Sequence, residues 1–384
     1  MKILWAHSHF DSGGGPKTVL AWALGLRELG YDIHFIGHGG RLLDAVISNG
    51  FDFKPLYGDR FRPSFVYAIN FLHYAKKIKP DVLVGVGNVT SMELALTAFL
   101  LRIPILLVFN VSPRKSFWLA DPNWKFPRIS DMVVVNQQFK KLCVKKFGWN
   151  ETQIHYIPER LLITENDSLN EETNFNRLCL VRRMDEIKSL SVFKLLKSME
   201  SFLRENYETT LDIYGDGSQQ LVVQDLCKNL NNKLNRQAVN FFGYVDGIET
   251  KLDNYGLVIG TEKVAIESVL SLRATAVLRN DGNLIPVRMS NIDYLSSDNF
   301  IGDACLTDLP MGVESLLKNI QAIEIDELFK MREWVKSHYD YKIGSTKIAN
   351  LLNSIGLPTK FIEYMIQLIK MYLSTIAKLI KSKG

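Results

Sequence analysis

The sequence predicts an α/β protein built from two consecutive parallel-sheet domains. Apolar runs of strand length, such as 81–86 and 104–109, alternate with segments of helical periodicity in both halves. Such runs are typical of strands covered on both faces of a parallel sheet. A strand, glycine loop, helix and strand occur in this order over 3–36 and again over 256–278. The 384 residues also exceed what one core usually supports.

The individual elements follow from periodicity and from their flanking residues. A helix over 18–29 has apolar residues at helical spacing and ends at Gly30, which is a common residue after a helix. The predicted strands are 3–6, 32–36, 81–86, 104–109, 132–135, 154–157, 178–181, 210–214, 239–242, 256–259 and 274–278. The other predicted helices are 65–79, 91–101, 190–205, 219–229 and one that carries Glu267.

A polar stretch without periodicity divides the two series of elements. We therefore predict a linker over 164–176, because polar segments of this kind commonly join domains. The predicted organisation is an N-terminal domain, the linker, a C-terminal domain, closing helices and an amphipathic helical tail. Their residues are 1–163, 164–176, 177–335, 336–356 and 357–384.

Composition narrows the class of protein. The formal charge of +5 is too mild to indicate nucleic-acid binding by itself. The four cysteines have no CxxC or Cys/His spacing, which argues against disulfides and a zinc site and for a reducing compartment. The N-terminus runs directly into a strand pattern, and no long uncharged apolar run occurs. We expect a cytoplasmic protein without a spanning helix.

Three local features suggest a phosphate or nucleotide site. Glycines 13–15 precede a helix, whose free N–H groups attract anions, although a tight turn explains them equally well. Arg183 and Lys188 follow a strand and suit a diphosphate, the alternative being a solvated basic loop. Glu267 lies in an apolar helix near the strand ends, where it either binds a ligand or pairs with a neighbouring base.

The order of these features resembles a known family. The glycine loop is followed by Val181-Arg-Arg-Met…Lys188, Ile213-Tyr-Gly-Asp-Gly217, Phe241-Phe-Gly-Tyr-Val245 and Val264-Ala-Ile-Glu267. This series is similar to that of the GT-B glycosyltransferases, specifically the retaining family 4. The resemblance covers about residues 1–355 and is densest over 178–277. It implies two Rossmann-like domains facing a cleft, to which this chain adds a C-terminal amphipathic helix.

The resemblance also implies roles for particular residues. Arg183 and Lys188 correspond to the pair that holds the donor diphosphate, and Gly14 and Gly15 to the loop that faces it. Glu267 corresponds to the second glutamate of a paired motif, which binds the ribose. The other implied nucleotide-binding residues are Gly215, Asp216, Gly217, Tyr244 and Val245. No cofactor or metal is implied, since a nucleotide-diphosphate sugar serves as co-substrate.

The chain departs from the family pattern at several positions. Ile259 stands where the first, sugar-facing glutamate is usual, and Glu262 is the nearest acidic candidate for that catalytic place. Arg182 replaces a glycine, and Asn110 stands where a histidine is common. Residues 272–274 and 157–160 also differ from the family's Gly-x-Pro and Ile-Pro-Asn-Gly. These departures concentrate at sugar-facing positions.

The tail is predicted to be an amphipathic helix. Over 360–381 the polar residues, four of them lysines, form a narrow strip beside a broad apolar face. That face either lies on an anionic membrane surface, packs on the N-terminal domain or makes an oligomer contact. Peripheral attachment to the inner face of a membrane is the expectation that the lysines favour.

The predicted function is transfer of a sugar from a nucleotide-diphosphate sugar to a glycan or lipid-linked acceptor, with retention, in surface polysaccharide or glycoconjugate synthesis. A catalytically degenerate GT-B protein that binds a nucleotide-sugar, a glycan or a partner enzyme is the alternative. A nucleotide-sugar epimerase on the same fold is a third reading. Nucleic acid is not an expected partner.

Overall fold

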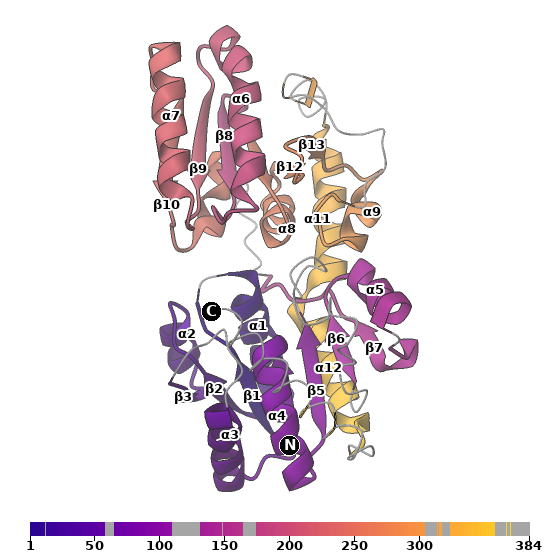
Figure 1. The fold of residues 1–384 in the computed structure, drawn as a ribbon. Coiled ribbons are helices and arrows are strands. Elements are labelled where there is room, and N and C mark those ends of the chain that lie inside the picture. Colours follow the sequence, from indigo (N-terminus) through magenta and orange to yellow (C-terminus); the bar gives the residue numbers. More distant parts are fainter. Residues whose placement is uncertain are drawn as a thin grey trace. The chain divides into compact units, whose positions relative to one another are not determined.

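The computed structural model contains two compact units (Figure 1). The first comprises residues 1–163 with 339–384, and the second comprises 164–338. The structure describes residues 1–11, 13–57, 65–109, 131–147, 149–163, 174–303, 313, 315–316, 323–357, 366 and 369. Asn110, most of the predicted linker and all of the predicted tail helix except Ile366 and Ile369 lie outside these ranges.

The first unit is a seven-stranded parallel sheet with helices. Its strands run in the order β3-β2-β1-β4-β5-β6-β7. Its elements are β1 (Lys2–His7), α1 (Gly14–Glu28), β2 (Asp32–Gly37), α2 (Leu43–Ser48), β3 (Asp52–Pro55), α3 (Phe65–Ile78), β4 (Val82–Val86), α4 (Asn88–Leu101), β5 (Ile105–Phe109), β6 (Met132–Val134), α5 (Gln137–Phe147), η2 (Glu151–Gln153), β7 (Ile154–Tyr156) and α12 (Tyr341–Ser354).

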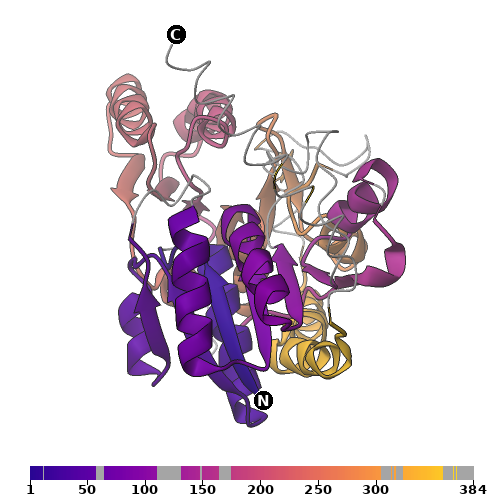
Figure 2. The same ribbon diagram turned by 60° about the horizontal axis from the view of Figure 1, so that its bottom comes forward.

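Alternation along the strands produces a core on each face of this sheet. Along β1, Leu4 and Ala6 belong to one apolar cluster, whereas Ile3 and Trp5 belong to the other. Helices α3 and α4 complete the first cluster and lie side by side, as Figure 2 shows. Helices α1 and α12 complete the second. Both faces are covered, as the continuous apolar strands predicted.

Helix α12 returns the end of the described chain to the first unit and packs against α1. The two helices approach closely because small residues lie between them. A Cβ atom on Gly344 would crowd the Trp22 indole of α1 and the carbonyl of Glu159, and one on Gly25 would overlap Ser345. Polar contacts add to this packing, since Ser345 Oγ donates to the Trp22 carbonyl at 3.2 Å. The indole of Trp22 donates to the Glu159 carbonyl.

The second unit is a six-stranded sheet in the order β10-β9-β8-β11-β12-β13, parallel except for β13. Buried residues of β8, β9, α6 and α7 share one apolar cluster. The elements of the second unit are β8 (Arg177–Val181), α6 (Ser189–Glu205), β9 (Thr210–Tyr214), α7 (Gln220–Leu234), β10 (Val239–Gly243), η3 (Ile248–Asn254), β11 (Leu257–Gly260), α8 (Lys263–Leu270), β12 (Ala274–Leu278), β13 (Leu284–Pro286), α9 (Ile292–Ser297) and α11 (Ile325–Tyr339).

The order of these strands creates a switch point in each sheet. In the second unit the chain proceeds outward from β8 through β9 to β10, then crosses back to β11 on the other side of β8. In the first unit the equivalent place lies between β1 and β4. Loops diverge at the carboxyl ends of such neighbouring strands, and α/β proteins bind ligands there. Among the described residues, no helix combines the length and apolarity needed to cross a membrane.

The close crossing of α1 and α12 predicts a cost for enlarging Gly344. Alanine has a higher helix propensity than glycine, by about 1 kcal/mol. At Gly344, however, the added methyl group meets a backbone carbonyl, and overpacking typically costs about 1–3 kcal/mol. We expect Gly344→Ala to lower the free energy of unfolding by roughly 1–2 kcal/mol in urea titrations.

Gly356→Ala is the matched control, because a Cβ atom there meets nothing within 4 Å. It should leave the unfolding free energy nearly unchanged. Equal stability of the Gly344→Ala protein and the wild type would contradict the packing of α12 on α1.

Candidate functional site

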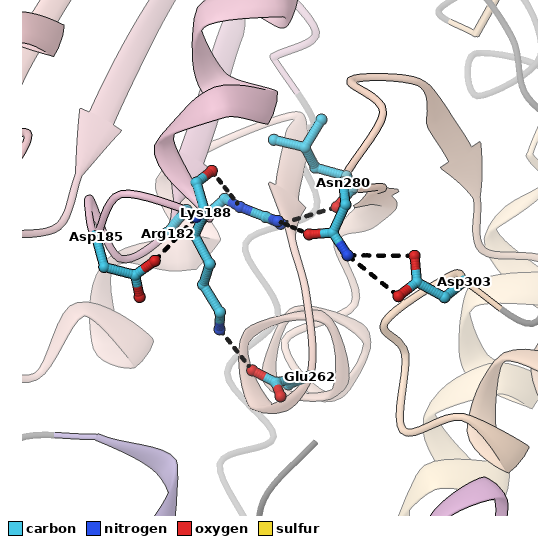
Figure 3. Close-up of polar contacts among 7 residues, drawn as sticks. Arg182, Asp185, Lys188, Glu262, Asn280 and Asp303 are labelled. Atoms are coloured by element: carbon cyan, nitrogen blue, oxygen red, sulfur yellow. Dashed lines mark hydrogen bonds and ion pairs between the residues drawn. The ribbon is translucent and has the colours of Figure 1, made fainter. Parts of the chain in front are cut away.

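Two charged side chains meet at the switch point of the second unit. Lys188 comes from the loop between β8 and α6, and Glu262 from the loop between β11 and α8. The Lys188 ammonium lies 2.9 Å from a carboxylate oxygen of Glu262 (Figure 3). Their side chains are 19% and 32% exposed, so solvent screens this pair less than it screens one at an open surface. The two loops are thereby joined at the place where a ligand is expected.

Arg182 is a buried cation of the same loop as Lys188. Its guanidinium donates to the carbonyl of Lys188 at 3.2 Å and to the carbonyl of Leu278, at the end of β12, at 2.8 Å. It also donates to Asn280 at 3.1 Å, and the Asn280 amide in turn donates to Asp303 (Figure 3). Arg182 therefore connects the start of α6 to the loop after β12.

Charge balance explains how Arg182 is tolerated at 6% exposure. Burial lowers the pKa of its guanidinium to about 10, while the carboxylates of Glu262, Asp185 and Asp303 oppose this shift. The group stays charged at pH 7, and its hydrogen bonds replace the water that it lost. Sequence reasoning noted Arg182 as a basic residue in place of a glycine and did not identify Asp185, Asn280 or Asp303. A charged residue in place of a glycine after a strand was the available signal.

Asp185 organises the beginning of α6. Its carboxylate accepts the N–H groups of Lys188 at 2.9 Å and Ile187 at 3.2 Å. A negative side chain is favourable there because the helix start carries a partial positive charge. Arg183, two residues earlier, is exposed. Within the described part of the chain it makes no hydrogen bond or ion pair, so its guanidinium is available to an anionic ligand.

Gly215 and Gly217 allow the loop after β9 to pack on the loop after β8. Both have positive φ angles, +138° and +152°, which favour glycine. A Cβ on Gly215 would overlap the carbonyl of Arg182, and one on Gly217 would overlap the backbone of Met184. The backbone carbonyl of Asp216, between them, accepts the Met184 N–H at 2.8 Å. The observed role of these glycines is close backbone packing, and nucleotide contact remains a prediction for all three residues.

Glu267 pairs with its helical neighbour Lys263 at 3.1 Å, with 17% of its side chain exposed. This is the paired carboxylate that sequence reasoning kept as an alternative, and ribose binding stays a prediction. The residues predicted to meet the base lie after β10. The Tyr244 hydroxyl donates to Asp246 at 3.1 Å, and Val245 packs near Tyr214 and Tyr255.

In the first unit, Gly14 and Gly15 begin α1, directly after Gly13. They therefore lie just after the loop that follows β1, which borders the switch point of that sheet. His7 ends β1 and is 4% exposed. Its Nδ1 atom accepts the His9 N–H at 3.1 Å, so Nε2 carries the hydrogen, and Nε2 has no partner among the described residues. Burial, with a smaller effect of His9, lowers the pKa of His7 to about 3.

The described ranges contain no group of three or more His, Cys, Asp or Glu residues arranged to hold a metal ion. The charged groups of the candidate site come from the loops at the carboxyl ends of β8 and β11. Lys188 and Arg183 suit a phosphate-bearing ligand because both cations come from the loop that follows β8.

Comparison by sequence finds no matching family model and no matching curated protein. Comparison by structure finds many similar chains. A glycosyltransferase from Rickettsia africae is 14% identical, with a TM-score of 0.66 over 91% of this chain and 97% of its own. The Anabaena protein HepE, in complex with UDP and glucose, is 13% identical, with a TM-score of 0.69 over 92% of this chain and 100% of its own.

A third similar structure is the UDP-GlcNAc 2-epimerase from Methanocaldococcus jannaschii. It is 15% identical, with a TM-score of 0.61 over 92% of this chain and 100% of its own. Identities this low establish the fold alone. The predicted fold class is confirmed: the chain has the two-sheet α/β fold of the GT-B glycosyltransferases and their structural neighbours.

Removing the Arg182 side chain should destabilise the second unit. Arg182→Ala leaves the carbonyls of Lys188 and Leu278 without a charged donor, and hydrogen bonds to charged groups are worth about 1.5–3 kcal/mol each. We expect a loss of roughly 2–3 kcal/mol in the unfolding free energy measured in urea. Arg183→Ala, which removes an exposed neighbour, should change it by less than about 0.5 kcal/mol. Similar losses of unfolding free energy in the two variants would argue against Arg182 as the residue that connects the two loops.

His7 should make the stability of the protein depend on pH. Its pKa in the folded state, about 3, lies below the unfolded value of 6.5, so the unfolded chain takes up a proton first as pH falls. Stability contributed by this residue is complete above pH 6.5 and declines towards pH 3. Between pH 7 and pH 5 the expected loss is about 2 kcal/mol. His7→Gln should remove this part of the slope in urea titrations at the two pH values. An unchanged slope would show that His7 is not a buried neutral imidazole.

Proposed function

We propose that the protein is a glycosyltransferase that moves a sugar from a nucleoside-diphosphate sugar to a glycan or lipid-linked acceptor. The observation that supports this most directly is the set of cations at the β8–β11 switch point of a GT-B fold. Lys188 and the exposed Arg183 follow the same strand, at the edge where α/β proteins bind ligands. The similar structure of HepE was determined with UDP and glucose, which is consistent with a nucleotide-sugar donor.

The proposed chemistry requires the stabilisation of a departing diphosphate. The bond between the anomeric carbon and the phosphate oxygen breaks, and its electron pair stays on the nucleoside diphosphate. An acceptor hydroxyl forms the new bond to the same carbon and gives its proton to the departing phosphate oxygen. Lys188 and Arg183 offset the charge that develops on the leaving group, which is effective in a site partly shielded from water. We propose that these side chains suffice without a metal or other cofactor, and that the sugar keeps its anomeric configuration.

In this proposal, Glu267 binds the ribose of the donor after leaving Lys263. The backbone near Gly215 and Tyr244 contacts the nucleotide. The first unit supplies the acceptor site, and its Gly14 and Gly15 contact the diphosphate. Surface polysaccharide or glycoconjugate synthesis is the process that fits such an acceptor.

Replacing Lys188 tests the donor site. Lys188→Met keeps the length of the side chain and removes the charge, so it should weaken UDP binding about 10- to 100-fold, the range for a lost charged hydrogen bond. Isothermal titration with UDP, GDP and ADP measures this effect and also identifies the base. Lys233→Met is the matched control, because Lys233 also pairs with a carboxylate at 2.9 Å, between α7 and α6. Equal loss in both variants, or none in Lys188→Met, would refute the assignment.

A non-catalytic nucleotide-sugar binding protein is the second candidate function. Ile259 favours it, because this apolar residue stands in place of the sugar-facing glutamate and is 1% exposed. Incubation with a panel of UDP-, GDP- and ADP-sugars, with and without acceptors, distinguishes the two functions. Nucleotide release supports the transferase. Tight nucleotide binding without release supports the binding protein, and a changed sugar on intact nucleotide would indicate an epimerase.

A further inference from the structure

Glu262 has a backbone conformation that is rare for a residue with a side chain. Its φ and ψ angles are 56° and −126°, and such strained conformations cost about 1–3 kcal/mol and cluster at functional sites. The strain is maintained from outside the loop, because the Glu262 N–H donates to the carbonyl of Phe300 at 3.1 Å. The position holds a glutamate, although glycine is the residue that this conformation favours.

This conformation accompanies an unusual use of the carboxylate. Glu262 is the residue immediately before α8, where an acidic side chain commonly accepts N–H groups of its own helix. Glu262 makes no such capping bond. Its carboxylate instead reaches across to Lys188, 74 residues earlier in the chain, at 2.9 Å (Figure 3). It is also the first among the carboxylates that oppose the lowered pKa of Arg182. The negative charge is thus directed at both inner cations of the candidate site.

An anionic ligand of Lys188 must therefore compete with a group that is already there. We propose that Glu262 is an internal competitor of the donor diphosphate: its carboxylate neutralises Lys188, and the diphosphate binds by displacing it. This inference rests on the proposed function. The pair weakens the binding of every nucleoside diphosphate by the free energy needed to separate it. Glu262 also assists product release, because its carboxylate forms the ion pair with Lys188 again as the nucleoside diphosphate leaves.

The experiment measures UDP affinity after the competitor is removed. Glu262→Gln keeps the size of the side chain and removes the charge, and titration calorimetry should show UDP binding roughly 2- to 5-fold tighter, the effect of releasing one partly exposed ion pair. In stopped-flow measurements the dissociation rate of UDP should fall. Glu200→Gln is the matched control, since it gives the same change in net charge and breaks a 2.9 Å pair with Lys233. Its UDP affinity should equal that of the wild type.

A second variant guards against loss of folding. Glu262→Gly removes the carboxylate and also relieves the positive φ angle, so it should fold at least as stably as the wild type and bind UDP more tightly. Combining Glu262→Gln with Lys188→Met should abolish the gain, because the competitor acts only through Lys188.

The outcomes separate this inference from the function on which it rests. If the wild type binds UDP and both Glu262 variants bind it equally or more weakly, Glu262 is a supporting or ligand-contacting residue and the competition is refuted. If the wild type and the variants bind no nucleotide, the proposed donor site itself is wrong. Tighter binding in both variants, with no change in Glu200→Gln, is the result that the proposal requires.

Discussion

The candidate site depends on the hydrogen bonds that the buried guanidinium of Arg182 donates to the backbone. A buried cation is tolerated only when its donors find acceptors and its charge finds carboxylates nearby. Arg182 meets both conditions by binding backbone from two different loops and one amide. The hydrogen bond from Arg182 to the Lys188 carbonyl thus helps to fix the geometry of the loop that carries Lys188. In a protein with glycine at this position, that loop would need another support.

This dependence gives the site a layered organisation. Arg182 is the most buried of the three cations, and its hydrogen bonds are made within the protein. Lys188 is partly exposed and pairs with Glu262, and it is the cation for which we propose a ligand. Arg183 is outermost and exposed. The three cations of one short loop therefore differ in role according to depth, although they carry the same charge.

The sequence predicted the elements well because local patterns determine them. Buried parallel strands such as 82–86 and 105–109 are continuous apolar runs, and the amphipathic helices between them have clear periodicity. The two-sheet fold followed from their alternation. The contacts within the candidate site could not be predicted in this way. Lys188 and Glu262 meet only because β8 and β11 are neighbours in the sheet, and neither periodicity nor spacing reveals a pairing across 74 residues.

The same limit applies to individual side chains. Glu267 was equally compatible with a ribose or with a neighbouring base, and in the structure it contacts Lys263. His7 was not singled out at all, because a histidine at the end of an apolar strand gives no sign of whether its imidazole is buried. Burial depends on the packing of Phe10 and the following loop, which is a tertiary property.

The return of α12 to the first unit has a consequence for biosynthesis. The second unit lies in the sequence between β7 and α12. The face of α1 that contains Trp22 and Gly25 therefore packs against a helix that is synthesised only after that whole unit. On the ribosome, the inserted unit is complete before its host is. Domains usually fold in the order of their synthesis, but the first unit here has its last helix only after the second unit has been made. Until α12 has been synthesised, the apolar residues of α1 that it covers in the folded protein lack this cover.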